Sequence, residues 1–273
     1  MSSHEKEILN SFLLQSPPCE YVELVKDLKS IVSDHKAIEC IVPDSIVNYC
    51  NTNCLLVETE GKKIILTKYN QVEKTQNEYY DPVNQQIHKI DFYQMKVIES
   101  RPFIKENTDL EILRKNVQQH LRSYTDEKYP LGSGMVLVNG QKLKIVISAI
   151  QNTTKNFCTG RWKSVWNVTL NSSNVEVTGS VEVFVHYYED ANIQMRNESE
   201  KKFSVGCGTK NDAFPKNLIK SIAEVEERLH SQLDVIFSTM NDTTFKSLRR
   251  QLPVSREKIN WANWRGAKMV ASK

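Results

Sequence analysis

The chain has 273 residues, of which 40% are hydrophobic and 25% charged, and its formal net charge is +3. This composition is typical of a soluble globular protein and excludes a largely disordered chain, and no apolar run reaches the roughly 20 residues that span a membrane. The first ten residues lack the apolar core of a secretion signal, so we expect a cytoplasmic protein in which five N-x-Ser/Thr sequons are chance matches.

The first fifty residues show helical spacing that prolines interrupt. Apolar residues recur at helical intervals over residues 5–14 and 20–33, and Ser16-Pro17-Pro18 separates the two segments. Pro43 is expected to start a third helix, because proline fits the first turn of a helix. The pattern predicts a small antiparallel helical bundle.

From Cys54 the apolar period changes to two, which predicts strands. These strands cover residues 54–58, 63–69 and 86–98. A Glu60-Gly61 turn links the first two, so we expect a hairpin or small meander. Helical spacing returns over residues 110–124, and the glycines at 132 and 134 end that helix.

A second β region follows, with hairpin-length links and no intervening helix. Its five predicted strands cover residues 135–138, 143–150, 161–170, 175–188 and 192–204. Asn139-Gly140 lies between two of these runs and is a strong hairpin signal, because glycine accepts the positive φ of a tight turn. The order of elements favours an antiparallel sheet.

A long helix is predicted from Pro215 to about Arg250. Its apolar residues step by three or four positions and form one stripe: Leu218, Ile222, Val225, Leu229, Leu233, Ile236 and Met240. At ~1.5 Å per residue the helix is roughly 50 Å long, which exceeds the width of a small domain. It either covers its own sheet or extends onto a partner.

The sequence offers no pattern of catalytic or metal-binding residues. Six scattered cysteines lack a second close pair at zinc-finger spacing, so we expect free thiols. Gly206-Cys207-Gly208 lacks the remainder of a phosphate-binding loop. His186 beside Glu189-Asp190 resembles an acid–base cluster, but neighbouring side chains of a strand point to opposite faces, which favours a simple turn. We expect no enzyme, no cofactor and no metal site.

The last 28 residues differ in kind from the rest of the chain. Residues 246–273 hold eight lysines and arginines against one glutamate, a net charge of +7, which leaves −4 for residues 1–245. Pro253 ends the long helix, and Ile259, Trp261 and Trp264 stand among the basic groups. Such an arm suits an acidic partner, with charge for steering and tryptophan for anchoring. A solvated tail, nucleic acid and anionic lipid are the alternatives.

Three segments resemble the F-actin-capping protein alpha subunit family, in order and spacing, over nearly the whole chain. They are Gly160-Arg161-Trp162-Lys163-Ser164-x-Trp166, Tyr187-Tyr188-Glu189-Asp190-Ala191-Asn192-Ile193-Gln194 and Leu248-Arg249-Arg250-Gln251-Leu252-Pro253-Val254-Ser255-Arg256-x-Lys258-Ile259-x-Trp261. The resemblance implies an obligate heterodimer with a beta subunit, in which the two sheets join edge to edge, long helices cross the joined sheet and N-terminal helices form a stalk.

By the same resemblance, the complex binds the barbed end of an actin filament without calcium and blocks subunit addition and loss in the actin cytoskeleton. Lys246, Arg250 and Arg256 match the family's basic actin contacts. The full set expected to bind actin is Lys246, Arg249, Arg250, Arg256, Lys258, Ile259 and Trp261. Phosphoinositide lipid is a further candidate ligand and nucleic acid is not. A basic-tailed protein that binds nucleic acid or anionic lipid is the alternative function.

The predicted fold class is α+β, in five segments along the chain. They are a helical stalk over residues 1–52, a small β meander over 53–108, a helix with a five-stranded antiparallel sheet over 109–211, one long covering helix over 212–252 and an extended actin-binding arm over 253–273.

Overall fold

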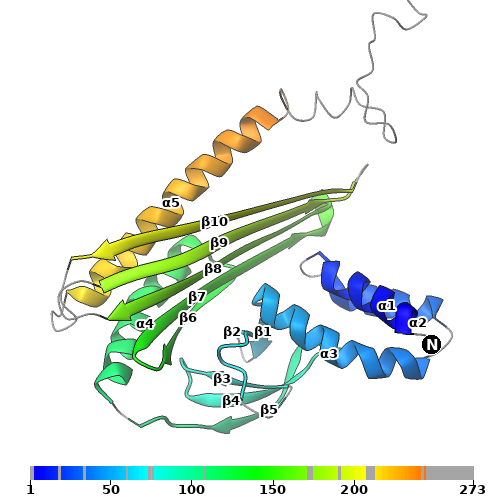
Figure 1. The fold of residues 1–273 in the computed structure, drawn as a ribbon, viewed down its shortest axis with the longest axis horizontal. Coiled ribbons are helices and arrows are strands. Elements are labelled where there is room, and N and C mark those ends of the chain that lie inside the picture. Colours follow the sequence, from blue (N-terminus) through cyan, green and yellow to red (C-terminus); the bar gives the residue numbers. More distant parts are fainter. Residues whose placement is uncertain are drawn as a thin grey trace, which may run out of the picture. The chain divides into compact units, whose positions relative to one another are not determined.

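The computed structural model is α+β, as predicted, with five α-helices and two five-stranded sheets in the residues it describes (Figure 1). Those residues are 3–17, 20–32, 35–59, 61–72, 75, 77–106, 108–170, 175–189, 192–206, 213–240 and 243. The chain divides into two compact units, Met1–Ser221 and Ile222–Lys273. No described helix is long and apolar enough to cross a membrane.

Three helices open the chain: α1 (Ser3–Gln15), α2 (Tyr21–Ile31) and α3 (His35–Asn53). The prediction that a third helix starts at Pro43 is wrong, because α3 begins eight residues earlier and continues through the proline. A proline removes a single backbone N–H, and a helix that is held by packing can continue past it.

The first sheet has the strand order β2-β1-β5-β4-β3. Its strands are β1 (Leu56–Thr59), β2 (Lys62–Ile65), β3 (Glu78–Asp81), β4 (Gln86–Asp91) and β5 (Lys96–Pro102). The β1–β2 hairpin lies parallel to β5, and β3, β4 and β5 form a meander. The single strand predicted over residues 86–98 is two strands, because the chain turns at residues 92–95, where Met95 takes a φ of 50°.

The N-terminal helices and the first sheet share one apolar core. Tyr21 and Val25 of α2 and Tyr49 of α3 pack in the same buried cluster as Val57 and Ile90 of the sheet. The Tyr21 hydroxyl also donates a hydrogen bond to the backbone carbonyl of Phe92. The helical segment therefore does not stand apart from the first sheet.

The central sheet is antiparallel with the strand order β10-β9-β8-β7-β6, as predicted. Its strands are β6 (Gly132–Asn139), β7 (Lys142–Thr153), β8 (Cys158–Leu170), β9 (Val175–Tyr187) and β10 (Ile193–Val205). Asn139 pairs with Lys142, so Gly140, with a φ of 60°, is the first and not the second central residue of the predicted hairpin turn. The hairpin is confirmed with the turn shifted by one residue.

Helix α4 (Asp109–Lys128) packs on β6 and closes that edge of the central sheet. The Gln118 side chain donates to the Gly134 carbonyl at 2.9 Å and accepts from the Val136 N–H at 2.8 Å. These contacts satisfy backbone groups that an unpaired edge would present to another strand. Within the described residues, no strand pairs with the outer edge of β10.

Helix α5 (Phe214–Met240) begins where the long helix was predicted to begin, and its predicted end lies beyond the described residues. Five members of the predicted apolar stripe are buried, namely Leu218, Ile222, Val225, Leu229 and Leu233. Val235, Ile236 and Phe237 near the described end are exposed. The stripe is therefore covered for about four turns and then opens to solvent.

Candidate functional site

All seven residues predicted to bind actin lie outside the described residues. They are Lys246, Arg249, Arg250, Arg256, Lys258, Ile259 and Trp261. The described part of α5 ends at Met240, and the Thr243 hydroxyl donates a 3.0 Å hydrogen bond to the Thr239 carbonyl one turn earlier. What the structure describes in detail is the sheet that precedes the arm, together with the groups that hold this sheet in place.

A cluster of charged side chains joins β8, β9 and β10 on one face of the central sheet. The buried Glu182 carboxylate accepts from the Arg161 guanidinium, from Lys163 Nζ at 2.5 Å and from Arg196 Nε at 3.1 Å. Three cations around one carboxylate compensate the cost of burying it. Burial would raise the pKa of Glu182, but Arg161 and Lys163 outweigh it and hold the pKa below its ordinary value.

The same cluster ties the end of α3 to the sheet. Arg161 also donates to the Asn53 side chain, and Lys163 Nζ donates to the Thr52 carbonyl at 3.1 Å. On β7, the Ser148 hydroxyl donates to the Cys54 carbonyl at 2.6 Å. The carbonyls at the end of a helix have no partners inside the helix, so the sheet supplies donors to this end of α3.

The tryptophans of the same motif lie on the opposite face of β8. Trp162 and Trp166 are buried, and the Trp162 ring lies 5.7 Å from the ring of Tyr129. Residue 179 on β9 pairs with Trp166 and is a glycine. The alternation of basic and aromatic residues in Gly160-Arg161-Trp162-Lys163-Ser164-x-Trp166 thus places cations toward α3 and indoles in the core.

His186 on β9 does not form a cluster with the acidic pair at 189–190. Its Nδ1 lies 2.8 Å from the Glu20 carboxylate at the start of α2, and its Nε2 lies 3.1 Å from the Asn192 side chain. Glu189 instead accepts a hydrogen bond from the Tyr187 hydroxyl, and position 190 is outside the described residues. His186 therefore links the N-terminal helices to the last hairpin of the sheet.

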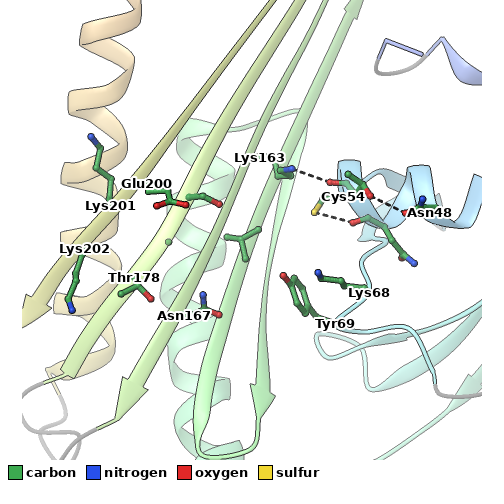
Figure 2. A pocket seen from close by; sticks show the side chains of 15 residues that line it. Asn48, Cys54, Lys68, Tyr69, Lys163, Asn167, Thr178, Glu200, Lys201 and Lys202 are labelled. Atoms are coloured by element: carbon green, nitrogen blue, oxygen red, sulfur yellow. Dashed lines mark hydrogen bonds between the residues drawn. The ribbon is translucent and has the colours of Figure 1, made fainter. Parts of the chain in front are cut away.

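A groove of about 790 Å³ runs between the end of α3 and the same face of the sheet (Figure 2). Its basic lining residues are Lys68, Lys163, Lys201 and Lys202, and Glu200 is its one acidic lining residue. Burial raises the pKa of Cys54, which also lines it, to about 11, so the thiol stays protonated at neutral pH and is a poor nucleophile.

The described residues offer little for metal or disulfide chemistry. They contain no group of three or more histidine, cysteine, aspartate or glutamate side chains placed to hold a metal ion. Cys50, Cys54 and Cys158 are free thiols, as predicted for the cysteines. This face of the sheet is lined by paired charges, amides and hydroxyls.

A family model described as the F-actin capping protein alpha subunit matches residues 9–272. The chain belongs to this family. The F-actin-capping protein subunit alpha of Dictyostelium discoideum is 33% identical over 280 residues, which cover 99% of this chain and 98% of that protein. Its counterpart in Caenorhabditis elegans is 31% identical and covers 96% of this chain and 94% of that protein.

A solved structure shows the same fold. The homodimeric actin capping protein alpha subunit from Plasmodium berghei superposes with a TM-score of 0.79 over 93% of this chain and 99% of that chain, at 23% identity. The family of F-actin capping protein alpha subunits is thus supported by sequence and by fold, and the actin-binding character of the family is shown. The relatives named here give no support to the alternative of a nucleic-acid or lipid binder.

Two of the motifs that resemble this family have structural roles in the fold. The Gly-Arg-Trp segment supplies both the cations that hold α3 and the tryptophans of the core, and His186 precedes the Tyr187-Tyr188 pair at the end of β9. The contacts between Glu20 and His186 and between Asn53 and Arg161 could not be predicted from the sequence. Each joins residues more than a hundred positions apart, and spacing along the chain carries no signal for such pairs. Lys144, a lysine inside the apolar run of β7, contacts the groove residues Tyr69 and Asn167.

Proposed function

We propose that this chain is the alpha subunit of a heterodimer that binds the barbed ends of actin filaments, independently of calcium, and blocks subunit addition and loss. The protein acts by binding and not by catalysis, in the cytoplasm and on the actin cytoskeleton. Its partner is a beta subunit, and anionic phosphoinositides are a further candidate ligand.

The observation that carries this proposal is the extent of the family match, which runs to residue 272 and so includes the basic arm. The arm has a net charge of +7 on a body of −4. Actin offers acidic surface at its filament ends, and opposite charge speeds the encounter of two proteins. The proposed contacts are Lys246, Arg249, Arg250, Arg256, Lys258, Ile259 and Trp261.

The two edges of the central sheet support the proposed subunit pairing. The β6 edge is closed by Gln118, whereas β10 is thirteen residues long and pairs with β9 alone among the described strands. A long unpaired edge strand presents a row of backbone donors and acceptors to another chain. An edge-to-edge partner on β10 would satisfy them and extend the sheet.

The charges of β10 favour a partner other than a second copy of this chain. In a two-fold antiparallel pair, residues of the same face lie opposite each other. A pair centred on Ser199 would set Glu198 opposite Glu200 and Arg196 opposite Lys202, and a pair centred on Glu198 or Glu200 would oppose that glutamate to itself. Like charges directly opposite destabilise a pair. The relative from Plasmodium berghei is homodimeric, so the assembly of this chain calls for a direct test.

The test of assembly is the mass of the purified protein in solution. We expect the chain expressed alone to be monomeric or aggregated, because β10 and the end of α5 lack cover, and the chain co-expressed with a beta subunit to elute as a 1:1 heterodimer. Multi-angle light scattering on a size-exclusion column measures both. A stable dimer of this chain alone, unaltered by an available beta subunit, would overturn the proposed heterodimer.

The test of function is actin elongation from sheared filament seeds, followed by pyrene fluorescence. Saturating heterodimer should stop barbed-end growth equally in calcium and in a calcium chelator, and should leave elongation from gelsolin-blocked seeds at the pointed end unchanged. The same complex should also slow the depolymerisation that follows dilution of the filaments, since one bound cap blocks both addition and loss of subunits. Normal barbed-end growth at saturating complex would refute the proposal.

A further inference from the structure

Two neighbouring lysines at the groove between α3 and the central sheet form no salt bridge in the described residues: Lys68, which lines the groove, and Lys144, which contacts its lining residues Tyr69 and Asn167. Figure 2 shows Lys68 and Tyr69 on one side of the groove and Glu200, Lys201 and Lys202 on the other, with Asn167 and Thr178 between them. Its volume of about 790 Å³ falls in the range of binding sites for small molecules or short segments. Its lining consists largely of ammonium, amide and hydroxyl groups.

Lys144 on β7 lies beside this lining and is only 8% exposed. Its ammonium donates to the Asn167 side chain and lies 3.9 Å from the centroid of the Tyr69 ring. Both contacts are with neutral groups. Lysine is rarely this buried without an anion, because an amide and an aromatic ring replace only part of the lost hydration.

Lys68 adds a second positive charge to the same place. Its ammonium lies 5.3 Å from the centroid of the same Tyr69 ring, and its side chain is exposed at the groove. Burial, and then the charge of Lys68, lower the pKa of Lys144. Two ammonium groups around one ring, each within the range of a cation–π contact, repel each other and attract any anion that enters.

Two of the other three lysines of the lining have carboxylate partners, whereas the described contacts include no salt bridge for Lys201 on β10. Lys163 pairs with Glu182 at 2.5 Å, and Lys202 pairs with Glu176. Glu200 is the one carboxylate that lines the groove, and it lies across the groove from Lys68 in Figure 2. Of the lysines at the groove, those without a carboxylate partner in the described residues are therefore Lys201 on β10 and the pair Lys68 and Lys144, of which Lys144 stands on β7, three strands from the β10 edge.

We propose that this groove binds an extended acidic segment of a partner protein, whose carboxylates seat against Lys68 and Lys144. Charge complementarity supplies the first argument, since an incoming carboxylate would give the two lysines the counter-ion that the chain does not provide. The second argument is the row of polar groups, Asn167, Thr178 and Ser180, that leads from these lysines toward β10. Their amide and hydroxyl groups can hydrogen-bond to the backbone of a segment that lies across the strands.

A protein segment fits this site better than other polyanions do. A membrane surface or a nucleic-acid duplex meets convex or flat basic surfaces, whereas Lys68 lines a groove and Lys144 is buried beside it. A single phosphate could reach Lys68, but it would leave the polar row toward β10 unused. All lining residues of the groove belong to Met1–Ser221, so the proposal uses no residue of the basic arm and does not depend on the function proposed for that arm.

The experiment uses the complex with a beta subunit and a fluorescein-labelled hexaglutamate peptide. Carbodiimide coupling joins a glutamate carboxylate to a lysine ammonium in contact with it, as an amide with loss of water, and mass spectrometry identifies the lysine. We expect coupling at Lys68 that fades as salt is raised. Coupling at lysines of the basic arm is read separately from the same digest, so binding to the arm is not confused with binding to the groove. Coupling confined to the arm would overturn the proposal.

Variants then test the two lysines by fluorescence anisotropy, in a background where Lys246→Glu, Arg250→Glu and Arg256→Glu suppress binding to the arm. The pair Lys68→Gln with Lys144→Gln should weaken peptide affinity at least about tenfold, and Lys68→Arg with Lys144→Arg should restore most of it. The matched control Lys155→Gln with Lys216→Gln removes two exposed charges away from the groove and should change affinity less than about twofold. Equal loss in both pairs would reject the site.

A final competition experiment distinguishes binding of an extended segment from binding of a single anion. Inorganic phosphate at millimolar concentration should displace the hexaglutamate peptide poorly, because it cannot use the polar row, and hexa-asparagine should not bind. Displacement by phosphate as effective as by unlabelled hexaglutamate would overturn the proposal of an extended segment. Circular dichroism and thermal unfolding of each variant complex confirm that lost binding is not lost folding.

Discussion

Gly179 on β9 lies directly opposite Trp166 on β8, and the indole occupies the space that a side chain at position 179 would need. A Cβ atom there would lie 2.5 Å from the Val165 carbonyl oxygen and 2.8 Å from indole Cδ2. We expect Gly179→Ala to lower the thermal midpoint of the complex by about 4–8 °C, since overpacking a buried site costs about 2 kcal/mol.

Gly160 on the neighbouring strand β8 is the matched control. A Cβ atom at Gly160 would meet nothing within 4 Å, and its φ is not in the left-handed region. Gly160→Ala should therefore leave the thermal midpoint unchanged or raise it slightly, because alanine reduces the entropy of the unfolded chain. Differential scanning fluorimetry measures the thermal midpoints of both variants. Equal midpoints for the two variants would show that the sheet relaxes around position 179.

The Glu182 carboxylate is predicted to be the group on which the sheet-to-α3 contact depends most. Glu182→Gln removes the anion that Arg161 and Lys163 share and leaves both cations in a buried site, at a cost of about 3 kcal/mol. Urea denaturation of the complex, followed by tryptophan fluorescence, measures the loss, because Trp162 and Trp166 lie on the same strand as the two cations.

Glu176→Gln is the control for this substitution on the same strand. Glu176 pairs with Lys202 at the surface, and both side chains are solvent-accessible. Its removal should cost less than about 1 kcal/mol. A loss at Glu182 no larger than that at Glu176 would mean that the buried cluster contributes nothing beyond an ordinary surface pair.

The pH dependence of stability follows from the same carboxylate. The pKa of Glu182 lies below its ordinary value of 4.5, because Arg161 and Lys163 outweigh the effect of burial. A carboxyl whose pKa is lower in the folded state stabilises the fold fully above its unfolded pKa and loses this contribution as pH falls through the folded value. We expect the unfolding free energy of the complex to fall below pH 4.5, more steeply for the parent than for Glu182→Gln. Parallel curves would exclude this role. Asp81, whose pKa is also lowered, should leave some acid sensitivity in the variant.

The strands of the central sheet could be predicted because their signals are local. Alternating apolar residues and the Asn139-Gly140 turn gave all five strands, although several strands extend up to three residues beyond their predicted bounds and glycine takes the first position of the turn. The first sheet was harder to predict. Gln85 and Met95 take positive φ without being glycine, so no glycine marks the two turns beside β4, although Pro82 lies in the first of them. The parallel contact of β1 with β5 depends on Glu58 and Lys96, which are far apart in sequence.

Of the two candidate sites, the basic arm could be predicted from the sequence and the groove could not. The basic arm was predicted from charge and from resemblance, both of which are present in the sequence itself. The groove was not predicted, because Lys68 lies in the turn after β2 whereas Lys144 is on β7, and the two meet only at the Tyr69 ring. A lysine between Leu143 and Ile145 breaks the apolar run of β7, yet the sequence does not show whether such a lysine finds a carboxylate.

Charge reversal in the arm is expected to slow capping by slowing association. The triple variant Lys246→Glu, Arg250→Glu and Arg256→Glu should lower the association rate constant at least about tenfold at low salt and raise the dissociation rate much less, since steering acts on the encounter. Seeded elongation at a series of complex concentrations gives the association rate, and rising salt should narrow the gap between variant and parent.

Reversal of three exposed lysines elsewhere controls for net charge. Lys26→Glu, Lys155→Glu and Lys216→Glu change the total charge by the same amount, and all three side chains are exposed in the described residues. This control should slow association less than about threefold, because steering depends on charge near the contact. Equal rates for the arm variant and the parent at low salt would rule out steering by these residues.

The apolar residues of the arm should mainly affect the dissociation rate constant. Ile259→Ala with Trp261→Ala removes the large side chains proposed to be buried at the filament end. Every charge stays in place, so the association rate constant should be nearly unchanged. Release should quicken at least about tenfold, since buried tryptophans are frequent hot spots and affinity differences among variants lie mostly in dissociation. Trp264→Ala, three residues beyond Trp261, is the matched control and should have the smaller effect. Regrowth of capped filaments after competition with excess fresh seeds measures release directly, and regrowth at the parental rate in the double variant would show that these two side chains are not the anchor.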